Sequence, residues 1–188
     1  MSNPYWDRIW QRKALEQEGD LKTICGWEKV NISSSSVVKT IKSRLDLKDN
    51  TSVLDLGCAA GFLTKSFLLE TQNYTGSDPS QNMVNLAKSI FDCDFINCEA
   101  SNLPFEDQQF DYIVAYSIFQ YFPSDDYAKK TISEMNRVSK KGIYIGDLPI
   151  SSHDDEHMLY SAKQFEGWIT SEGMYTDKRF DAWKIKYE

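Results

Sequence analysis

Short apolar runs alternate with longer amphipathic segments from residue 52 onward. Short apolar runs are typical of buried strands, and apolar residues spaced three or four apart are typical of helices packed on a sheet. Their alternation predicts a Rossmann-like three-layer α/β sandwich, with a mostly parallel sheet and helices on both faces. The predicted strands are 53–56, 74–77, 94–97, 112–116 and 142–145, and the predicted helices are 62–69, 81–90 and 125–138.

The first fifty residues precede this alternation. Residues 1–50 are predicted to form a helical N-terminal extension or lid, ahead of a single globular unit over 51–188. Four serines at 33–36 predict a helix start, because serine is a favoured N-cap and apolar residues follow at helical spacing. Those apolar residues are Val37, Val38, Ile41 and Leu45.

The C-terminal part also departs from the alternation. A polar loop, SSHDDEH, follows Pro149, and a helix is predicted at 161–170. The closing stretch KRFDAWKIKYE alternates polar and apolar residues well enough to predict a strand. We expect it to form an antiparallel C-terminal edge of the sheet.

Composition and charge narrow the class of protein. The 188 residues carry a formal net charge of −7, which speaks against nucleic-acid partners because their affinity comes largely from Lys and Arg. The sequence contains no apolar stretch of membrane-spanning length, and its N-terminus lacks the apolar centre of a signal peptide. We therefore expect a cytoplasmic protein. We also expect a monomer or homodimer. The irregular spacing of four cysteines and the absence of a CxxC pair predict no metal site.

The stretch VLDLGCAAGFL, residues 53–63, carries the main chemical signal. It passes from a predicted strand to a predicted helix, where open parallel sheets bind ligands and free backbone N–H groups are expected. Gly57 and Gly61 permit unusual backbone angles, and Ala59 and Ala60 keep side-chain bulk low. The turn therefore predicts a site where a small ligand approaches the backbone closely.

Asp78 ends the second predicted strand and narrows the ligand class. A carboxylate about twenty residues beyond the first glycine of such a turn can accept both hydroxyls of an adenosine ribose. A dinucleotide and an adenosyl sulfonium both satisfy this pattern, although the complete dinucleotide fingerprint would need glycines at Ala59 and Phe62. The alternative is that Asp78 caps the helix that begins near Pro79.

Three blocks in order, VLDLGCAAGFL, GSDPSQNMVNLAK and EASNLPFEDQQFDYIVAYSIFQYF, resemble the class I S-adenosylmethionine-dependent methyltransferases, in particular the small-molecule methyltransferases. The resemblance covers about residues 52–149 and implies S-adenosylmethionine as cofactor. It implies that Asp55 and the glycine turn face the methionine part, and that Asp78 holds the ribose. The implied cofactor-binding set is Asp55, Gly57, Cys58, Ala59, Gly61, Asp78, Pro79, Met83, Glu99, Ala100, Ser101, Tyr116 and Ser117.

Within this set, Met83, Glu99 and Ala100 should lie near the adenine, and Tyr116 and Ser117 near the sulfonium. The chain departs from the family at two positions. Ala59 replaces the central glycine of the turn, which slightly reduces the space for a ligand beside the backbone. Gln120 stands where many relatives carry a histidine. The second departure removes one candidate base.

Methyl transfer from a sulfonium needs a base only when the acceptor must lose a proton. His153 is the predicted catalytic base, because histidine titrates near neutrality; the alternative is a solvated histidine in an acidic loop. The run HDDEH could also hold a metal, which the family does not require. The predicted acceptor-binding set is Tyr5, Trp6, Trp10, Gln120, Tyr121 and His157.

Tyr5, Trp6 and Trp10 recur at helical spacing near the N-terminus. A helix with such an aromatic face is either docked on the domain or a lid over cofactor and acceptor. An aromatic lid suits a sulfonium, because cation–π attraction favours the charged cofactor over its neutral product.

The sequence predicts methyl transfer to an oxygen or nitrogen of a small polar acceptor, free or carrier-linked. A sugar or surface-polysaccharide intermediate is the preferred acceptor, because the aromatic N-terminus resembles methyltransferases of polysaccharide biosynthesis. Two alternatives stay open. One is a noncatalytic cofactor-binding partner subunit, which an exposed apolar patch around Trp27 or Trp168 would favour. The other is a nicotinamide-dependent oxidoreductase.

Overall fold

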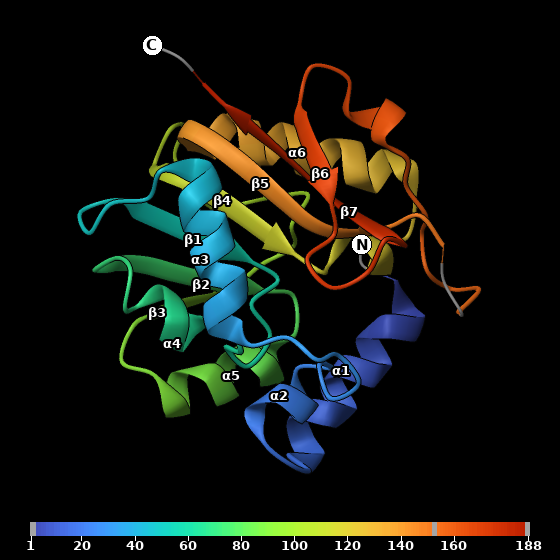
Figure 1. The fold of residues 1–188 in the computed structure, drawn as a ribbon. Helices are drawn as coiled ribbons and strands as arrows, with labels where there is room; N and C mark the ends of the chain where they lie inside the picture. Colours follow the sequence, from blue (N-terminus) through green and yellow to red (C-terminus); the bar gives the residue numbers. More distant parts are fainter. Residues whose placement is uncertain (1–2, 152–153, 187–188) are drawn as a thin grey trace.

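A computed structural model describes residues 3–151 and 154–186. Its centre is a seven-stranded sheet in the order β3-β2-β1-β4-β5-β7-β6 (Figure 1). The pairs from β3 through β5 are parallel, and β7 runs antiparallel to both β5 and β6. The strands are β1 (Ser52–Leu56), β2 (Asn73–Asp78), β3 (Asp94–Asn97), β4 (Phe110–Tyr116), β5 (Ser139–Pro149), β6 (Ile169–Glu172) and β7 (Arg179–Ile185).

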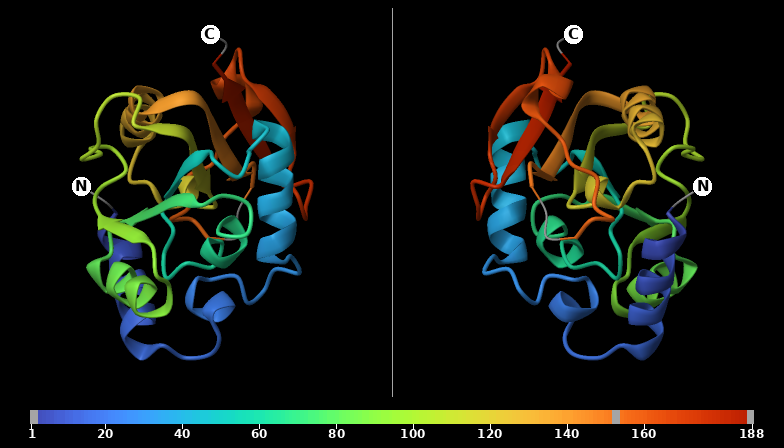
Figure 2. Two further views of the ribbon diagram at one scale, coloured as in Figure 1. Left: turned by 90° about the vertical axis from the view of Figure 1, so that its left-hand side faces the viewer. Right: turned by 90° about the vertical axis from the view of Figure 1, so that its right-hand side faces the viewer.

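Helices cover both faces of the sheet, and Figure 2 shows α3 and α6 on opposite sides of it. The helices are α1 (Pro4–Glu16), α2 (Leu21–Ile24), α3 (Ser34–Leu45), α4 (Thr64–Phe67), α5 (Gln81–Ile90) and α6 (Asp125–Val138), with 3-10 turns η1 (Phe119–Tyr121) and η2 (Ala162–Phe165). The Rossmann-like α/β prediction is confirmed.

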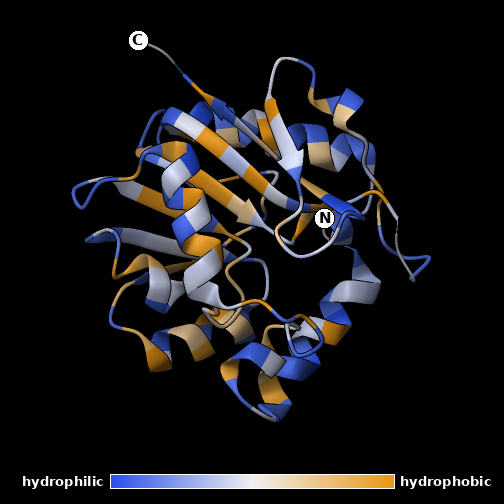
Figure 3. Cartoon of the chain, in the orientation of Figure 1, coloured by the Kyte–Doolittle hydropathy of each residue, from blue (hydrophilic) through white to orange (hydrophobic). Residues whose placement is uncertain are grey.

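Alternation along the strands divides the core into two clusters. On β1, Val53 packs with α3, α4 and α5, whereas Leu54 and Leu56 pack with α6 on the other face. Successive strand residues point to opposite faces, so a strand covered on both sides is apolar at nearly every position. Figure 3 shows hydrophobic positions recurring along the central strands.

The N-terminal segment joins the same core. α3 begins at the Ser33 cap, whose side chain accepts the Ser36 N–H, and its Val37 and Ile41 are fully buried. Ala14 of α1 and Trp27 belong to the same cluster. The division into an extension over 1–50 and a unit over 51–188 stays a prediction.

Three sequence predictions differ from the structure. The helix predicted at 62–69 is reduced to the single turn α4, which follows hydrogen-bonded turns around Gly61. The helix predicted at 161–170 is reduced to the 3-10 turn η2, because Gly167 takes a left-handed φ of 80° and the chain from Ile169 pairs with β7 as β6. The closing strand β7 is antiparallel as predicted, but it lies inside β6 and is not the outermost strand.

No helix in the described ranges 3–151 and 154–186 is long and apolar enough to cross a membrane.

Candidate active site

A cavity of about 470 Å³ lies at the carboxyl ends of β1, β2, β4 and β5. This volume is typical of sites for small ligands and cofactors, and the position is where open parallel sheets bind them. The cavity brings together most of the predicted residues. They are Asp55, Gly57, Cys58, Ala59, Asp78, Pro79, Met83, Ala100, Tyr116 and Ser117 of the predicted cofactor set, and Trp6, Trp10, Gln120, Tyr121 and His157 of the predicted acceptor set.

Other predicted residues lie beside the cavity. Glu99 accepts a hydrogen bond of 2.6 Å from the Tyr127 hydroxyl, and Tyr127 itself lines the cavity. Ser101 lies two residues after Glu99 in the chain. Tyr5 packs edge-on against Trp6 at the surface. His153, the predicted base, lies outside the described residues.

The turn after β1 is tightly wound. Gly57, Ala59 and Gly61 have φ angles of 75°, 48° and 94°, in the left-handed region that glycine adopts most easily. A Cβ atom at Gly57 would lie 2.4 Å from Cγ2 of Ile118. A Cβ at Gly61 would instead meet Phe91, so this glycine serves packing against the end of α5.

The N–H groups of this turn bond within the protein, which corrects the expectation that they are free for a ligand. The N–H groups of Gly57 and Cys58 donate to the carbonyl of Ser77, at 2.7 and 2.9 Å. Gly61 donates to Cys58, and Ala59 donates to the Asp78 carboxylate at 2.9 Å. A ligand can therefore approach the backbone of this turn closely. The turn has little capacity to bind a phosphate, because its N–H groups already have partners in the protein.

Asp78 ties the first turn to the start of α5. Its carboxylate accepts the N–H groups of Ala59 and Ser80, at 2.9 and 2.8 Å, and Ser80 caps the helix. Burial raises the pKa of Asp78 to about 6, against the lowering effect of these two bonds. A carboxylate accepts about four hydrogen bonds, so the structural role leaves capacity for ribose hydroxyls.

Asp55 is a second buried carboxylate on the cavity wall, at 3% exposure. It accepts a 2.9 Å hydrogen bond from the Tyr74 hydroxyl, which lies 2.8 Å from the Thr64 hydroxyl. Burial raises the pKa of Asp55 to about 7, and the negative charge of Asp78 adds to this shift. A positively charged ligand group beside Asp55 would favour its ionised form.

Aromatic side chains form one wall of the cavity. Trp27 lies between Phe62 and Tyr116 in a nearly parallel stack, with ring centroids 5.5 and 5.4 Å away. Trp27 also meets Tyr175 edge-on. Sequence reasoning considered Trp27 only as the centre of an exposed apolar patch, because its packing partners are distant in the chain.

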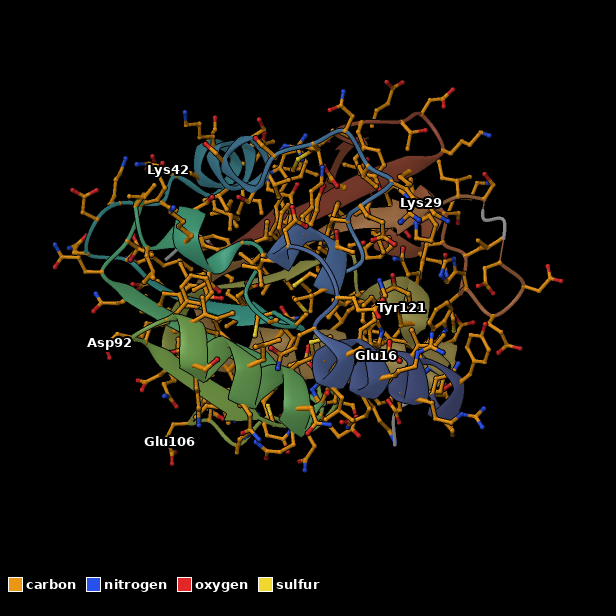
Figure 4. The ribbon with its side chains drawn as sticks, turned by 90° about the horizontal axis from the view of Figure 1, so that it is seen from below. Glu16, Lys29, Lys42, Asp92, Glu106 and Tyr121 are labelled. Carbon is orange, nitrogen blue, oxygen red and sulfur yellow. The ribbon has the colours of Figure 1, made fainter. Side chains whose placement is uncertain are left out.

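A second aromatic cluster joins α1 to the loop after β5. Trp6 stacks on His157 with centroids 4.8 Å apart, and its indole N–H donates to the carbonyl of Glu156 at 3.3 Å. Tyr121 contacts Trp6, Trp10 and His157. Figure 4 shows Tyr121 beside α1, whose last residue Glu16 is labelled.

Sequence reasoning missed a polar network at the ends of β4 and β5. Asp147 accepts hydrogen bonds from the Tyr175 hydroxyl and the Arg179 guanidinium, at 2.7 and 3.0 Å. Arg179 also donates to Gln120, whose amide donates to the Ser117 hydroxyl at 3.2 Å. The only available sequence signal was an aspartate two residues beyond the predicted strand 142–145.

The cysteines and the acidic loop do not form a second centre in the described part of the chain. Cys25 and Cys58 are buried, free and part of the cavity lining. Burial raises the pKa of the Cys25 thiol to about 12, so it is a poor nucleophile near neutrality. Among residues 3–151 and 154–186, no cluster of three or more His, Cys, Asp or Glu side chains is arranged to hold a metal.

Known proteins share this sequence pattern. A family model described as a methyltransferase domain matches residues 53–142. The "Probable tRNA methyltransferase 9B" of Mus musculus is 33% identical over 98 residues, 52% of this chain and 21% of that protein. The demethylmenaquinone methyltransferase of Staphylococcus saprophyticus is 31% identical over 111 residues, 55% of this chain and 46% of that protein. The chain thus spans about half or less of the length of these curated relatives.

Solved structures share the fold. The magnesium protoporphyrin IX methyltransferase of Synechocystis, crystallised with S-adenosylmethionine, matches with a TM-score of 0.67 and 15% identity, over 99% of this chain and 93% of that one. The strand order, the matched family model and the three sequence blocks agree. Residues 53–142 thus match the methyltransferase-domain family, and the chain around them has the fold of solved methyltransferases.

Proposed function

We propose that this chain transfers the methyl group of S-adenosylmethionine to an oxygen or nitrogen of a small polar acceptor, free or carrier-linked. The observation that carries the proposal is the pair Asp55 and Asp78, two buried carboxylates at the ends of neighbouring strands, both lining one cavity. Asp55 would face the ammonium group of the cofactor, and Asp78 the ribose hydroxyls. The sulfonium supplies an activated methyl group, so the chain mainly positions donor and acceptor and excludes water.

The same geometry weighs against a nicotinamide dinucleotide. Such a ligand brings a pyrophosphate to the first turn, where backbone N–H groups normally receive it. Here those of Gly57, Cys58 and Ala59 bond to Ser77 and Asp78. A phosphate would also face the carboxylates of Asp55 and Asp78.

The partner-subunit alternative has less support. Trp27, around which an exposed apolar patch would favour it, is 8% exposed and stacked in the cavity wall. Trp168 packs edge-on against Phe165.

The names of the relatives do not identify the acceptor. One relative is named for tRNA and another for demethylmenaquinone, while the net charge of −7 disfavours a polyanionic substrate. The polysaccharide pathway stays a prediction.

Calorimetric titration with S-adenosylhomocysteine, with NAD in parallel, tests the cofactor. We expect saturable one-site binding of S-adenosylhomocysteine and none of NAD. Binding of NAD alone would favour the oxidoreductase. Cofactor binding without turnover across a broad acceptor screen would favour the noncatalytic subunit.

Asp78→Ala should weaken S-adenosylhomocysteine binding by about tenfold to a hundredfold, because a hydrogen bond to a charged group contributes about 1.5 to 3 kcal/mol. Asp78→Asn keeps an acceptor oxygen for the Ala59 N–H. It therefore distinguishes a loss of affinity caused by a disturbed fold from one caused by the lost contact with the ligand. Asp92→Ala, at an exposed position, is the control. Unchanged affinity in calorimetry, with the fold intact by circular dichroism, would remove Asp78 from the site.

Trp6→Ala should raise the cofactor dissociation rate by about tenfold, because Trp6 joins α1 to the loop that carries His157 and a stacked aromatic contact contributes about 0.5 to 1.5 kcal/mol beyond area burial. Stopped-flow fluorescence measures this rate. The matched control on the same helix is Leu15→Ala, whose side chain is 70% exposed. Lower stability with an unchanged dissociation rate would make α1 a docked helix and not a lid.

A further inference from the structure

The ends of β4 and β5 share an unusual backbone. Ser117 directly follows β4, and Asp147 lies two residues before the last residue of β5; their φ angles are 61° and 63°. Non-glycine residues rarely adopt this left-handed conformation, and those that do tend to occur at functional sites. The Ser117 N–H donates to the carbonyl of Gly146 at 3.0 Å, which fixes one strand end to the other.

Asp147 is held in this conformation from β7. The pairing of β5 with β7 shifts between Ile145 and Leu148, and the Asp147 N–H donates at 2.8 Å to the side chain of Asp181. The Asp147 carboxylate accepts from Tyr175 and Arg179 on the cavity wall. Backbone and side chain of Asp147 are thus both fixed by the elements around the cavity.

The position of this network suits an acceptor. β1 pairs with β4 and β4 with β5, so with strands spaced about 4.8 Å the end of β5 lies about 10 Å from that of β1. A cofactor held by Asp55 and Asp78 leaves this end of the cavity for the molecule that receives the methyl group. Of the network residues, only Ser117 belongs to the predicted cofactor-binding set, so Asp147, Tyr175 and Arg179 are available to the acceptor.

The chemistry of the network selects the acceptor. Asp147 and Arg179 compensate each other's charge, so the network suits an uncharged molecule. The Tyr175 hydroxyl donates to Asp147, which leaves its oxygen able to accept a proton from the acceptor. Trp27 meets Tyr175 edge-on and stacks on Tyr116, and such aromatic surfaces pack well against a flat ring.

We propose that Tyr175, Asp147 and Arg179 form the acceptor subsite, that it takes a hydroxyl group on a flat, uncharged ring, and that Asp147 receives the hydroxyl proton through Tyr175. In this step the acceptor oxygen forms a bond to the methyl carbon as the carbon–sulfur bond breaks. The hydroxyl proton moves to Tyr175, whose own proton moves to Asp147. The products are a methyl ether, neutral S-adenosylhomocysteine and a protonated Asp147, which then releases its proton to solvent.

The state of Asp147 fits this role. Burial raises its pKa to about 6, so it is ionised near neutrality and close to the range of an effective base. Burial also raises the pKa of Tyr175, which keeps the hydroxyl protonated until the acceptor proton arrives. His153, the base predicted from the sequence, is not required by this route.

The inference rests on the proposed function, so the first measurement is S-adenosylhomocysteine binding, whose absence would overturn both. Protein saturated with S-adenosylhomocysteine is then titrated by NMR with phenol, resorcinol and 2-naphthol, each against its methyl ether. We expect each hydroxyl compound to bind about tenfold more tightly than its ether, which cannot donate a hydrogen bond. Tyr175→Phe should abolish this difference, and Tyr160→Phe, which alters a tyrosine outside the cavity lining, should preserve it.

Two outcomes would overturn the subsite: equal binding of hydroxyl and ether by the wild-type protein, or a difference that survives in Tyr175→Phe. The proton path is tested with S-adenosylmethionine, by following formation of the methyl ether of the tightest probe. Asp147→Asn should slow this reaction by about a hundredfold, within the range of base catalysis, while S-adenosylhomocysteine binding stays unchanged. Ether formation at the wild-type rate in Asp147→Asn, or none in the wild-type protein, would overturn the path.

Discussion

Arg44→Met should lower the free energy of unfolding by about 3 to 5 kcal/mol, because it leaves a buried charge without its partner. Asp181 is fully buried, and the Arg44 guanidinium donates to it at 2.5 Å. The same guanidinium donates to Tyr144 and Ser171, at 2.6 and 2.7 Å, and lies 4.7 Å from the Trp183 ring centroid. Chemical denaturation followed by circular dichroism measures the change.

The neighbouring Lys42 on α3 is a matched control. It forms an ion pair of 2.6 Å with Glu70 near the surface, and exposed pairs of this kind contribute little. Lys42→Met should therefore destabilise the protein far less than Arg44→Met. The double variant Arg44→Met/Asp181→Asn should recover part of the loss, because it also removes the unpaired charge.

If Arg44→Met and Lys42→Met proved equally mild, the buried pair would not hold α3 to the sheet. A loss in Arg44→Met that the double variant does not reduce would assign the effect to the contacts with Tyr144 and Trp183.

Asp55→Asn should weaken S-adenosylmethionine binding by about thirtyfold to a thousandfold near neutral pH, because truncating one partner of a buried charge pair costs about 2 to 4 kcal/mol. Calorimetry measures the affinity. The control ligand is 5′-methylthioadenosine, which lacks the amino acid and should bind both proteins alike. An equal loss for both ligands would mean that Asp55 acts through the fold of the turn and not through the ammonium group.

The same residue predicts a pH dependence. In the folded protein without ligand, burial raises the pKa of Asp55 from 3.8 to about 7. Its neutral form therefore adds stability below about pH 4, and this contribution is lost as the pH rises through about 7. The cofactor ammonium favours the ionised form, so affinity should fall as the pH is lowered from about 7.5 to about 5.5.

Groups around Asp55 contribute to that dependence. Tyr74 donates to Asp55, and Asp78, with a pKa raised to about 6, titrates in the same window. Asp55→Asn should remove the change in affinity near pH 7 and leave the change near pH 6 that is due to Asp78. A profile identical to that of the wild-type protein would show that Asp55 does not titrate on binding.

Local patterns predicted several elements to the residue. The helices at 81–90 and 125–138 and the strand at 94–97 coincide with α5, α6 and β3. Each helix begins after a serine cap, Ser80 or Ser124, and has regularly spaced apolar residues. Such signals lie within a few neighbouring residues, so they can be recognised in the sequence without knowledge of the tertiary structure.

The glycine turn and Asp78 were predictable for a related reason. The ends of parallel strands meet at one edge of the sheet, so the order of strands along the chain was enough to place both in one cavity. How they hold each other was not predictable. The turn's N–H groups are taken by Ser77 and Asp78, and these bonds depend on the pairing of β1 with β2.

By itself, the sequence determined the alternation of strands and helices, the serine cap of α3, and the family blocks around the glycine turn after β1. Only the tertiary structure decided which distant side chains meet, both around the cavity and in the buried ion pair under α3. Trp6 meets Glu156 across 150 positions, Asp147 meets Tyr175 across 28, and Arg44 meets Asp181 across 137. Contacts at such separations leave no periodicity in the chain, because they are made between side chains that only the closed sheet and its docked helices bring together.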